Sequence, residues 1–195
     1  PISFFNQKLD KQVLKYFKIK SKKRANLLPW KKITKITLNT KKIVNIGIIG
    51  KYVNLKDAYK SLDEALTHGG ISNKVKVNLI RIESDKLKPN QINKKLKNVS
   101  GLLIPGGFGK RGTEGKISAI KYAREKKIPF LGICFGMQMA IIEFARNKLK
   151  IRKAGSTELD KKCFPVVGLI NEWNKEGKVI KGTDKDLGGT MRLGL

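Results

Sequence analysis

Cysteine and histidine are scarce in this sequence, and their scarcity excludes several kinds of site at the outset. The chain has two cysteines and one histidine, His68. Cys134 and Cys163 lie far apart and form no C-x-x-C pair, which excludes a cysteine-rich zinc site and a disulfide framework. We therefore expect a reducing, cytoplasmic setting and no metal site in this part of the protein.

Long apolar runs are also missing. No run approaches the roughly 20 residues that a membrane-spanning helix needs, so we expect no membrane partner. The N-terminal segment PISFFNQKLDKQ turns polar after five residues, which is unlike a signal peptide. The chain begins with Pro1 rather than Met, and we expect it to be a piece of a longer protein.

Acidic residues are few, and the charge balance is strongly basic. The sequence has 15 Asp and Glu against 43 Lys and Arg, a formal net charge of +28. Such a charge suits a nucleic-acid partner, because Lys and Arg neutralise phosphates. The lysines, however, are spread over almost every segment and far outnumber arginine, which base and phosphate recognition favours. We expect a solvated lysine surface and no specific nucleic-acid partner; a basic nucleic-acid-associated protein stays an alternative.

Apolar runs and helical periods alternate from residue 43 onward, and this predicts an α/β fold. The expected strands are 43–50, 74–82, 101–107 and 128–133, and the expected helices are 57–70, 89–98, 113–127 and 136–146. The alternation predicts a three-layer sandwich with a mostly parallel sheet. Ligands bind such sheets beyond the carboxyl ends of the strands, where the loops 50–57 and 105–115 and the turn at Cys134 are expected.

The N-terminal part is less regular. Residues 6–18 place apolar side chains on one helical face, with Asn6 as a plausible cap. Residues 18–42 are basic and show no clear period, so we interpret them as a linker.

For the helix expected over 57–70, we expect Asp57 at its start and glycines just past its end.

Cys134 occupies the junction of a strand and a helix in FLGICFGMQMA, residues 130–140. G-I-C-F-G has the spacing of a nucleophile elbow, a sharp turn where neighbouring side chains must be hydrogen. The positive end of the following helix would favour a thiolate, and the Phe135 N–H would help to hold an oxyanion. The alternatives are a thiol nucleophile, which we prefer, and a buried core cysteine.

The loop PGGFGKRGTEG, residues 105–115, leaves three interpretations open. Gly106, Gly107 and Gly109 allow a ligand to approach the backbone closely. A phosphate cradle is one possibility, although the Walker spacing G-x-x-x-x-G-K-[ST] is not met. A bare glycine turn and an oxyanion donor beside Cys134 are the other two.

Several segments together are similar to one known family. GKYVNLKDAYKSLDEALTHGG, GLLIPGGFGKRGTEGKISAIKYAREKKIPFLGICFGMQMAIIEFARN, AGSTELD and GGTMRLG resemble the class I glutamine amidotransferase domain of the CTP synthase family. The resemblance is collinear from about Ile43 to the last residue and implies a flavodoxin-like fold. It implies that residues 43–195 form this amidotransferase domain, incomplete at its C-terminus. Residues 1–42 resemble the end of the family's synthase domain and its interdomain linker.

The resemblance implies a reaction. Cys134 would attack the side-chain amide of L-glutamine and release ammonia from a thioester. The synthase domain of the same enzyme would use the ammonia to convert UTP to CTP, with ATP and Mg²⁺ bound there and GTP as an allosteric activator. No cofactor is expected in the amidotransferase domain itself, and the full-length family forms homotetramers.

The same resemblance assigns binding residues. The positions that match the family's glutamine site are Gly107, Phe108, Phe135, Gly136, Met137, Gln138 and Glu158. Glu158 would bind the α-ammonium of glutamine, which suits a carboxylate. Lys110, Arg111 and Glu114 match a lid loop that is thought to sense GTP.

The match stops before the family's catalytic His and Glu, which belong to an H-P-E segment that these 195 residues do not contain. We interpret His68 as a surface residue near a helix end and Cys163 as a strand-edge cysteine without chemistry. Because a base is needed to move the proton to departing ammonia, we expect this stretch alone to have little glutaminase activity. A catalytically incomplete, amidotransferase-like binding module is the remaining alternative.

Overall fold

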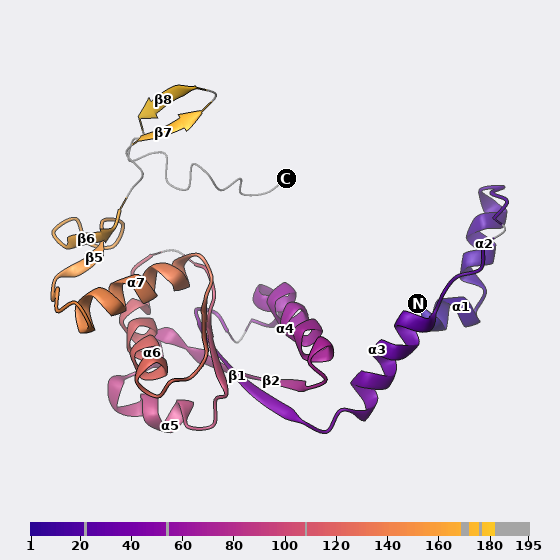
Figure 1. The fold of residues 1–195 in the computed structure, drawn as a ribbon, viewed down its shortest axis with the longest axis horizontal. Helices are drawn as coiled ribbons and strands as arrows, with labels where there is room; N and C mark the ends of the chain where they lie inside the picture. The colour runs from indigo at the N-terminus through magenta and orange to yellow at the C-terminus, as the bar shows by residue number, and fades with distance from the viewer. Residues whose placement is uncertain (22, 54, 108, 169–171, 176, 182–195) are drawn as a thin grey trace. The chain divides into compact units, whose positions relative to one another are not determined.

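A computed structural model describes residues 1–21, 23–53, 55–107, 109–168, 172–175 and 177–181 (Figure 1). The chain divides into two compact units. One comprises Pro1–Val44 and Tyr59–Asn78, and the other comprises Asn45–Ala58 and Leu79–Leu195. The domain boundary expected at residue 43 stays a prediction.

Two short helices occupy the start of the first unit, where one helix over 6–18 was expected. They are α1 (Ile2–Asn6) and α2 (Leu9–Tyr16). The helical conformation is interrupted at Lys8, which has a left-handed φ of 59° and immediately precedes α2. Asn6 ends α1 and therefore caps no helix, which corrects the expectation from the sequence.

The expected linker over 18–42 contains a helix, α3 (Leu28–Asn39), with Pro29 in its first turn. The sequence concealed this helix, because its β-branched Ile and Thr residues have modest helix propensity. None of the described residues of α3 is buried, so this helix is not held by a packed apolar face.

The helix α4 (Lys60–Ser72) also differs from its prediction. Asp57 lies in a 3₁₀ turn before it, Lys56–Tyr59, and the helix runs on through Gly69 and Gly70. A Cβ at Gly70 would come within 2.8 Å of the Val75 carbonyl oxygen. This glycine is therefore needed for close packing against the following strand and does not end the helix.

The sheet contains four strands in the order β2-β1-β3-β4. Their bounds are β1 Ile43–Gly50, β2 Lys76–Glu83, β3 Gly101–Ile104 and β4 Phe130–Gly132. β3 runs parallel to both β1 and β4, with Ile46 opposite Gly101 and Ile104 opposite Gly132. The expectation of a mostly parallel α/β sheet is confirmed.

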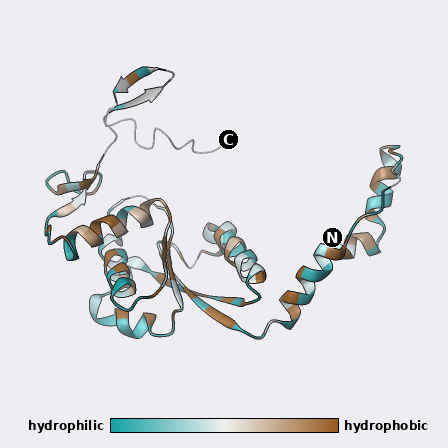
Figure 2. Ribbon diagram, in the orientation of Figure 1, coloured by the Kyte–Doolittle hydropathy of each residue, from teal (hydrophilic) through white to brown (hydrophobic). Residues whose placement is uncertain are grey.

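Three helices of the second unit flank this sheet: α5 (Ile92–Leu96), α6 (Thr113–Glu125) and α7 (Phe135–Asn147). α5 follows a 3₁₀ turn at Pro89–Gln91. α6 and α7 lie side by side (Figure 1). α7 carries apolar residues along most of its length, whereas α6 mixes apolar and polar ones (Figure 2). The core between helices and sheet includes Ile49, Leu102, Ile104, Ile120, Met139 and Ile142.

Two small sheets follow α7 in the sequence. β5 (Ala154–Ser156) pairs in parallel with β6 (Phe164–Val167), and β7 (Glu172–Lys175) forms an antiparallel hairpin with β8 (Lys178–Lys181). Within the described residues, no helix has both the length and the apolar character that crossing a membrane requires.

Candidate active site

The turn between β4 and α7 carries Cys134 in a strained backbone conformation. Its φ is 52° and its ψ is −108°, which lies outside the regions that non-glycine residues populate. Such strain costs on the order of 1–3 kcal/mol and persists only where the surroundings hold it. The half-buried Cys134 precedes the first residue of α7, as the elbow spacing predicts.

The two glycines of this motif are required by close packing. A Cβ at Gly132 would lie 2.6 Å from the backbone carbon of Gly136. A Cβ at Gly136 would lie 2.1 Å from the carbonyl oxygen of Ile104, at the end of β3. Real Cβ contacts are never this short, so the predicted need for hydrogen at both positions is confirmed.

Hydrogen bonds hold the elbow from both sides. The Ile133 N–H donates to the Ile104 carbonyl at 2.9 Å, and the Cys134 carbonyl accepts from the N–H groups of Met137 and Gln138 at 3.0 and 3.2 Å. The N–H of Phe135 donates to no backbone carbonyl among the described residues. It is one of the unsatisfied donors that open every helix N-terminus.

The glycine loop after β3 lies against the elbow. A Cβ at Gly106 would be 3.6 Å from the Cβ of Cys134. Gly107 has a φ of 137°, a conformation that favours glycine, and a Cβ there would meet nothing within 4 Å. The two loops therefore meet at one edge of the sheet, as expected. Phe108, the aromatic position of the predicted glutamine site, lies outside the described residues.

Glu158 is connected to this same loop. Its Oε1 accepts a hydrogen bond from the Gly109 N–H at 3.2 Å. The Lys51 Nζ, just after β1, donates to the Gly109 carbonyl at 3.1 Å. Glu158 and Lys51, from separate parts of the chain, therefore both hydrogen-bond to the glycine loop after β3. Sequence analysis did not single out Lys51 as a residue of this loop's surroundings.

The remaining residues of the predicted glutamine site take different positions along α7. Phe135 is buried, with 1% of its surface exposed. Gln138 is half-buried and Gly136 is buried. Met137 is 54% exposed and lines an apolar hollow of about 420 Å³ together with Ile141 and Phe144.

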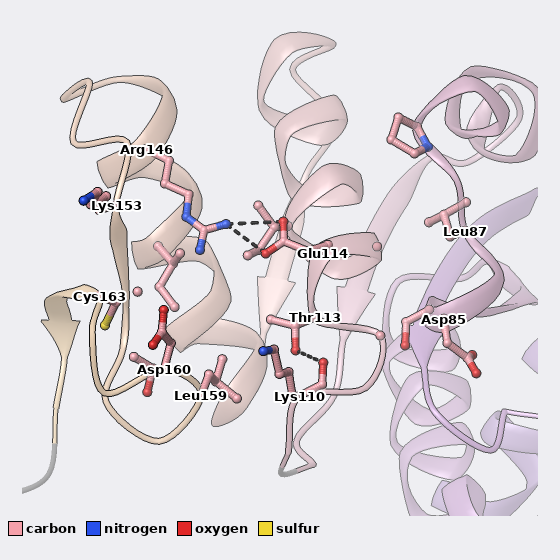
Figure 3. Close-up of a pocket in the computed structure, with 18 of the residues that line it drawn as sticks. Asp85, Leu87, Lys110, Thr113, Glu114, Arg146, Lys153, Leu159, Asp160 and Cys163 are labelled. Carbon is pink, nitrogen blue, oxygen red and sulfur yellow. Dashed lines mark hydrogen bonds and ion pairs between the residues drawn. The ribbon is translucent and has the colours of Figure 1, made fainter.

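The three lid residues make different contacts, although the ion-pair partner of Arg111, Asp85, lines the same cavity as Lys110 and Glu114. The Arg111 guanidinium lies 4.6 Å from the centre of the Tyr52 ring and 4.0 Å from the Asp85 carboxylate. Lys110 and Glu114 instead line a cavity of about 710 Å³ at the N-terminus of α6 (Figure 3). There Glu114 accepts a hydrogen bond from Arg146 at 3.0 Å, and Cys134 is not among the lining residues.

Two charged side chains are buried inside the described part of the chain, Lys116 on α6 and Glu143 on α7, each 1% exposed. The Lys116 ammonium lies 4.7 Å from the centre of the Phe135 ring. Burial, with a smaller contribution from Lys51, lowers the pKa of Lys116 to about 8. The burial of Lys116 could have been predicted from the sequence, because Lys116 lies one helical turn before the buried Ile120 and therefore on the same face of α6.

The surface position expected for His68 is confirmed, whereas the absence of chemistry at Cys163 stays a prediction. His68 is a surface residue of α4, in the first unit, and lies 3.9 Å from Glu64. Cys163 is a free cysteine immediately before β6. Among the described residues, no cluster of three or more His, Cys, Asp or Glu side chains is arranged to hold a metal ion.

Comparison with known proteins relates this site to a family. Residues 54–195 match the family "Glutamine amidotransferase class-I". CTP synthases of Pelagibacter ubique and Zymomonas mobilis are 77% and 48% identical to this chain over 194 and 197 residues, covering 100% of it. The chain spans 36% of the length of each.

A solved structure is similar as well. The glutaminase domain of Trypanosoma brucei CTPS with bound acivicin is 34% identical, with a TM-score of 0.62 over 69% of this chain and 53% of that one. The family match covers most of the chain, and the fold and the elbow geometry agree with it. The chain therefore belongs to the class I glutamine amidotransferase family.

Proposed function

We propose that this chain is the glutaminase part of a CTP synthase and that Cys134 is its nucleophile. The observation that carries the proposal is the strained Cys134, which lies between the end of β4 and the N-terminus of α7 and beside the glycine loop. The similarity to CTP synthases supports the choice of family member. The two cysteines, neither of them in a disulfide, suit a reducing, cytoplasmic setting.

The geometry of the elbow supports the following reaction. The Cys134 thiolate attacks the side-chain amide carbon of glutamine, and the N–H of Phe135 with the loop at Gly107 stabilises the resulting oxyanion. The carbon–nitrogen bond breaks, ammonia leaves with an added proton, and water then hydrolyses the thioester to glutamate and the free thiol. Glu158 binds the α-ammonium group. In the full-length protein, the synthase domain uses ATP and Mg²⁺ to aminate UTP with this ammonia. GTP activates the glutaminase reaction.

The proton transfers need a base. The family takes its base from an H-P-E segment, and the only histidine among these 195 residues is His68. We therefore propose that residues 1–195 expressed alone react slowly with glutamine and that the full-length protein turns over efficiently. Equal rates of ammonia release from the two would contradict this part of the proposal.

The central test is covalent labelling of the full-length protein with acivicin, a glutamine-like electrophile. Peptide mass spectrometry should find the label on Cys134 and should find none in the Cys134→Ser variant. Cys163→Ser is the matched control and should label like the wild type, because Cys163 lies outside the elbow. A folded wild-type protein whose Cys134 remains unlabelled would overturn the proposed function.

A further inference from the structure

We propose that Lys116 is a positioning residue of the nucleophile elbow: its buried ammonium fixes the Phe135 ring and thereby holds Cys134 in its strained conformation. The inference rests on the proposed function of Cys134 and goes beyond it. Lys116 lies on α6, and Phe135 is the first residue of α7, directly after Cys134.

The environment of Lys116 is unusual for a buried charge. Glu143, the other buried charged residue of the described chain, is paired with the Arg124 guanidinium at 2.8 Å. No hydrogen bond or ion pair of the Lys116 ammonium occurs within the described residues, and its neighbour is the face of Phe135 at 4.7 Å. Burying a charge without a carboxylate is costly, so a merely apolar side chain would pack more favourably at this position.

The charged groups around Lys116 do not neutralise it. Lys51, on the loop after β1, is the charged neighbour that acts on it, and it lowers its pKa further. The first turn of α7 contains no acidic residue. Arg111, Glu158 and Asp85 lie near Lys51 instead and influence the pKa of that residue. The ammonium is therefore attracted mainly by the aromatic ring.

The contact acts on the residue next to the strained turn. A cation is attracted to the face of an aromatic ring, and the attraction is stronger where water is excluded. The positive φ of Cys134 is unfavourable and persists only where the surroundings hold it. Loss of the cation would therefore let the first turn of α7 relax and would present the thiol less well. The tight packing at Gly132 and Gly136 holds the other side of the turn.

The contact also depends on pH. With a pKa of about 8, the Lys116 amine is mostly protonated at pH 7 and mostly neutral at pH 9.5. A neutral amine has no cation–π attraction, so any effect of Lys116 on Cys134 should disappear at the higher pH. A residue that only fills space would act equally at both values.

The test compares acivicin labelling rates of Cys134 in the full-length protein at pH 7 and pH 9.5. We expect Lys116→Met to label roughly tenfold more slowly than wild type at pH 7, since the cation–π contact with Phe135 is lost, and to match it at pH 9.5. Lys116→Arg keeps a permanent charge and should label at least as fast as wild type at both values. Lys121→Met, an exposed lysine on the same helix, is the matched control and should not differ from wild type.

The outcomes separate the two proposals. An unlabelled wild type overturns the proposed function together with this inference. A labelled wild type with an equally fast Lys116→Met variant overturns the inference alone, as does a variant that is slow by the same factor at both pH values. A denaturation curve of Lys116→Met accompanies the test, and we expect this variant to be at least as stable as wild type at pH 7.

Discussion

The buried carboxylate of Glu143 on α7 accepts hydrogen bonds from both Nε and Nη2 of Arg124 on α6, the shortest of them 2.8 Å long. Only 1% of the Glu143 side chain is exposed, against 28% for Arg124. The hydrogen bonds and charge of Glu143 raise the pKa of Arg124. This pair joins the two helices that support the elbow.

Removing one partner of this pair should destabilise the protein strongly. Arg124→Met leaves a buried carboxylate unpaired, which costs about 3 kcal/mol, the lower end of the usual range because Arg124 is partly exposed. Urea denaturation measures the free energy of unfolding. The double variant Arg124→Met with Glu143→Met should recover most of the loss, since apolar residues replace a buried ion pair at little cost.

A matched control is available on the same helix. Lys121 and Glu125 form an exposed pair at 4.0 Å, and Lys121→Met should change the free energy of unfolding by less than about 1 kcal/mol. If Arg124→Met were as mild as Lys121→Met, the buried pair would not be a tie between α6 and α7.

The elbow glycines allow a second prediction. Gly136→Ala should prevent folding or cost more than about 3 kcal/mol, because its Cβ would lie 2.1 Å from the backbone oxygen of Ile104. Gly69→Ala on α4 is the control: its Cβ meets nothing within 4 Å, so it should stabilise the protein by roughly 0.5–1 kcal/mol. Thermal and urea denaturation of both variants check this. A Gly136→Ala protein of wild-type stability would refute the packing described at the elbow.

The elbow could be predicted from the sequence because the residues that determine it are close together in the chain. Glycines two residues before and after Cys134 between an apolar run and a helical period determine the turn, and the adjacent glycine loop follows from parallel strand topology. The helix α3 was missed because its β-branched Ile and Thr residues have modest helix propensity. Gly69 and Gly70 misled the prediction of α4, since the close approach of Val75 is a tertiary contact.

The buried charges could be predicted only in part. Glu143 lies one helical turn after the buried Met139, and Lys116 one turn before Ile120, so helical period places both on inward faces. Their partners, Arg124 and the Phe135 ring, come from another helix, and sequence spacing does not reveal such pairs. The contacts of Arg111 with Tyr52 and Asp85 likewise depend on tertiary packing.

Glu158 provides a third prediction, which separates its charge from its contact with the loop. Glu158→Gln keeps an oxygen that can accept from the Gly109 N–H and removes the negative charge. We expect the KM for glutamine in the full-length protein to rise by about tenfold or more with little change in stability, because a hydrogen bond to a charged group contributes about 1.5–3 kcal/mol. Asp160→Asn, an exposed neighbour, is the control and should leave KM unchanged. An unchanged KM in Glu158→Gln would count against ammonium binding.

The pKa of Lys116 leads to a last prediction about stability and pH. Its folded value of about 8 lies below the ordinary 10.5 of an unfolded chain, so between these values the unfolded state binds more protons and stability rises with pH. The full cost of burying the charge is present below pH 8 and corresponds to roughly 3 kcal/mol. Lys116→Met removes the charge, and its advantage over wild type should be largest at pH 7 and shrink toward pH 10.5.

Urea denaturation of wild type and Lys116→Met at pH 7, 8.5 and 10 measures this difference, and the titration of the other lysines cancels in the subtraction. Part of the gain is offset by the lost contact with Phe135, so the net advantage at pH 7 should be smaller than the full cost of burial. Lys121→Met should differ from wild type by the same small amount at all three pH values. If the difference in free energy of unfolding between Lys116→Met and wild type were the same at all three pH values, Lys116 would not titrate in this range. The pH dependence inferred for the elbow would then be refuted as well.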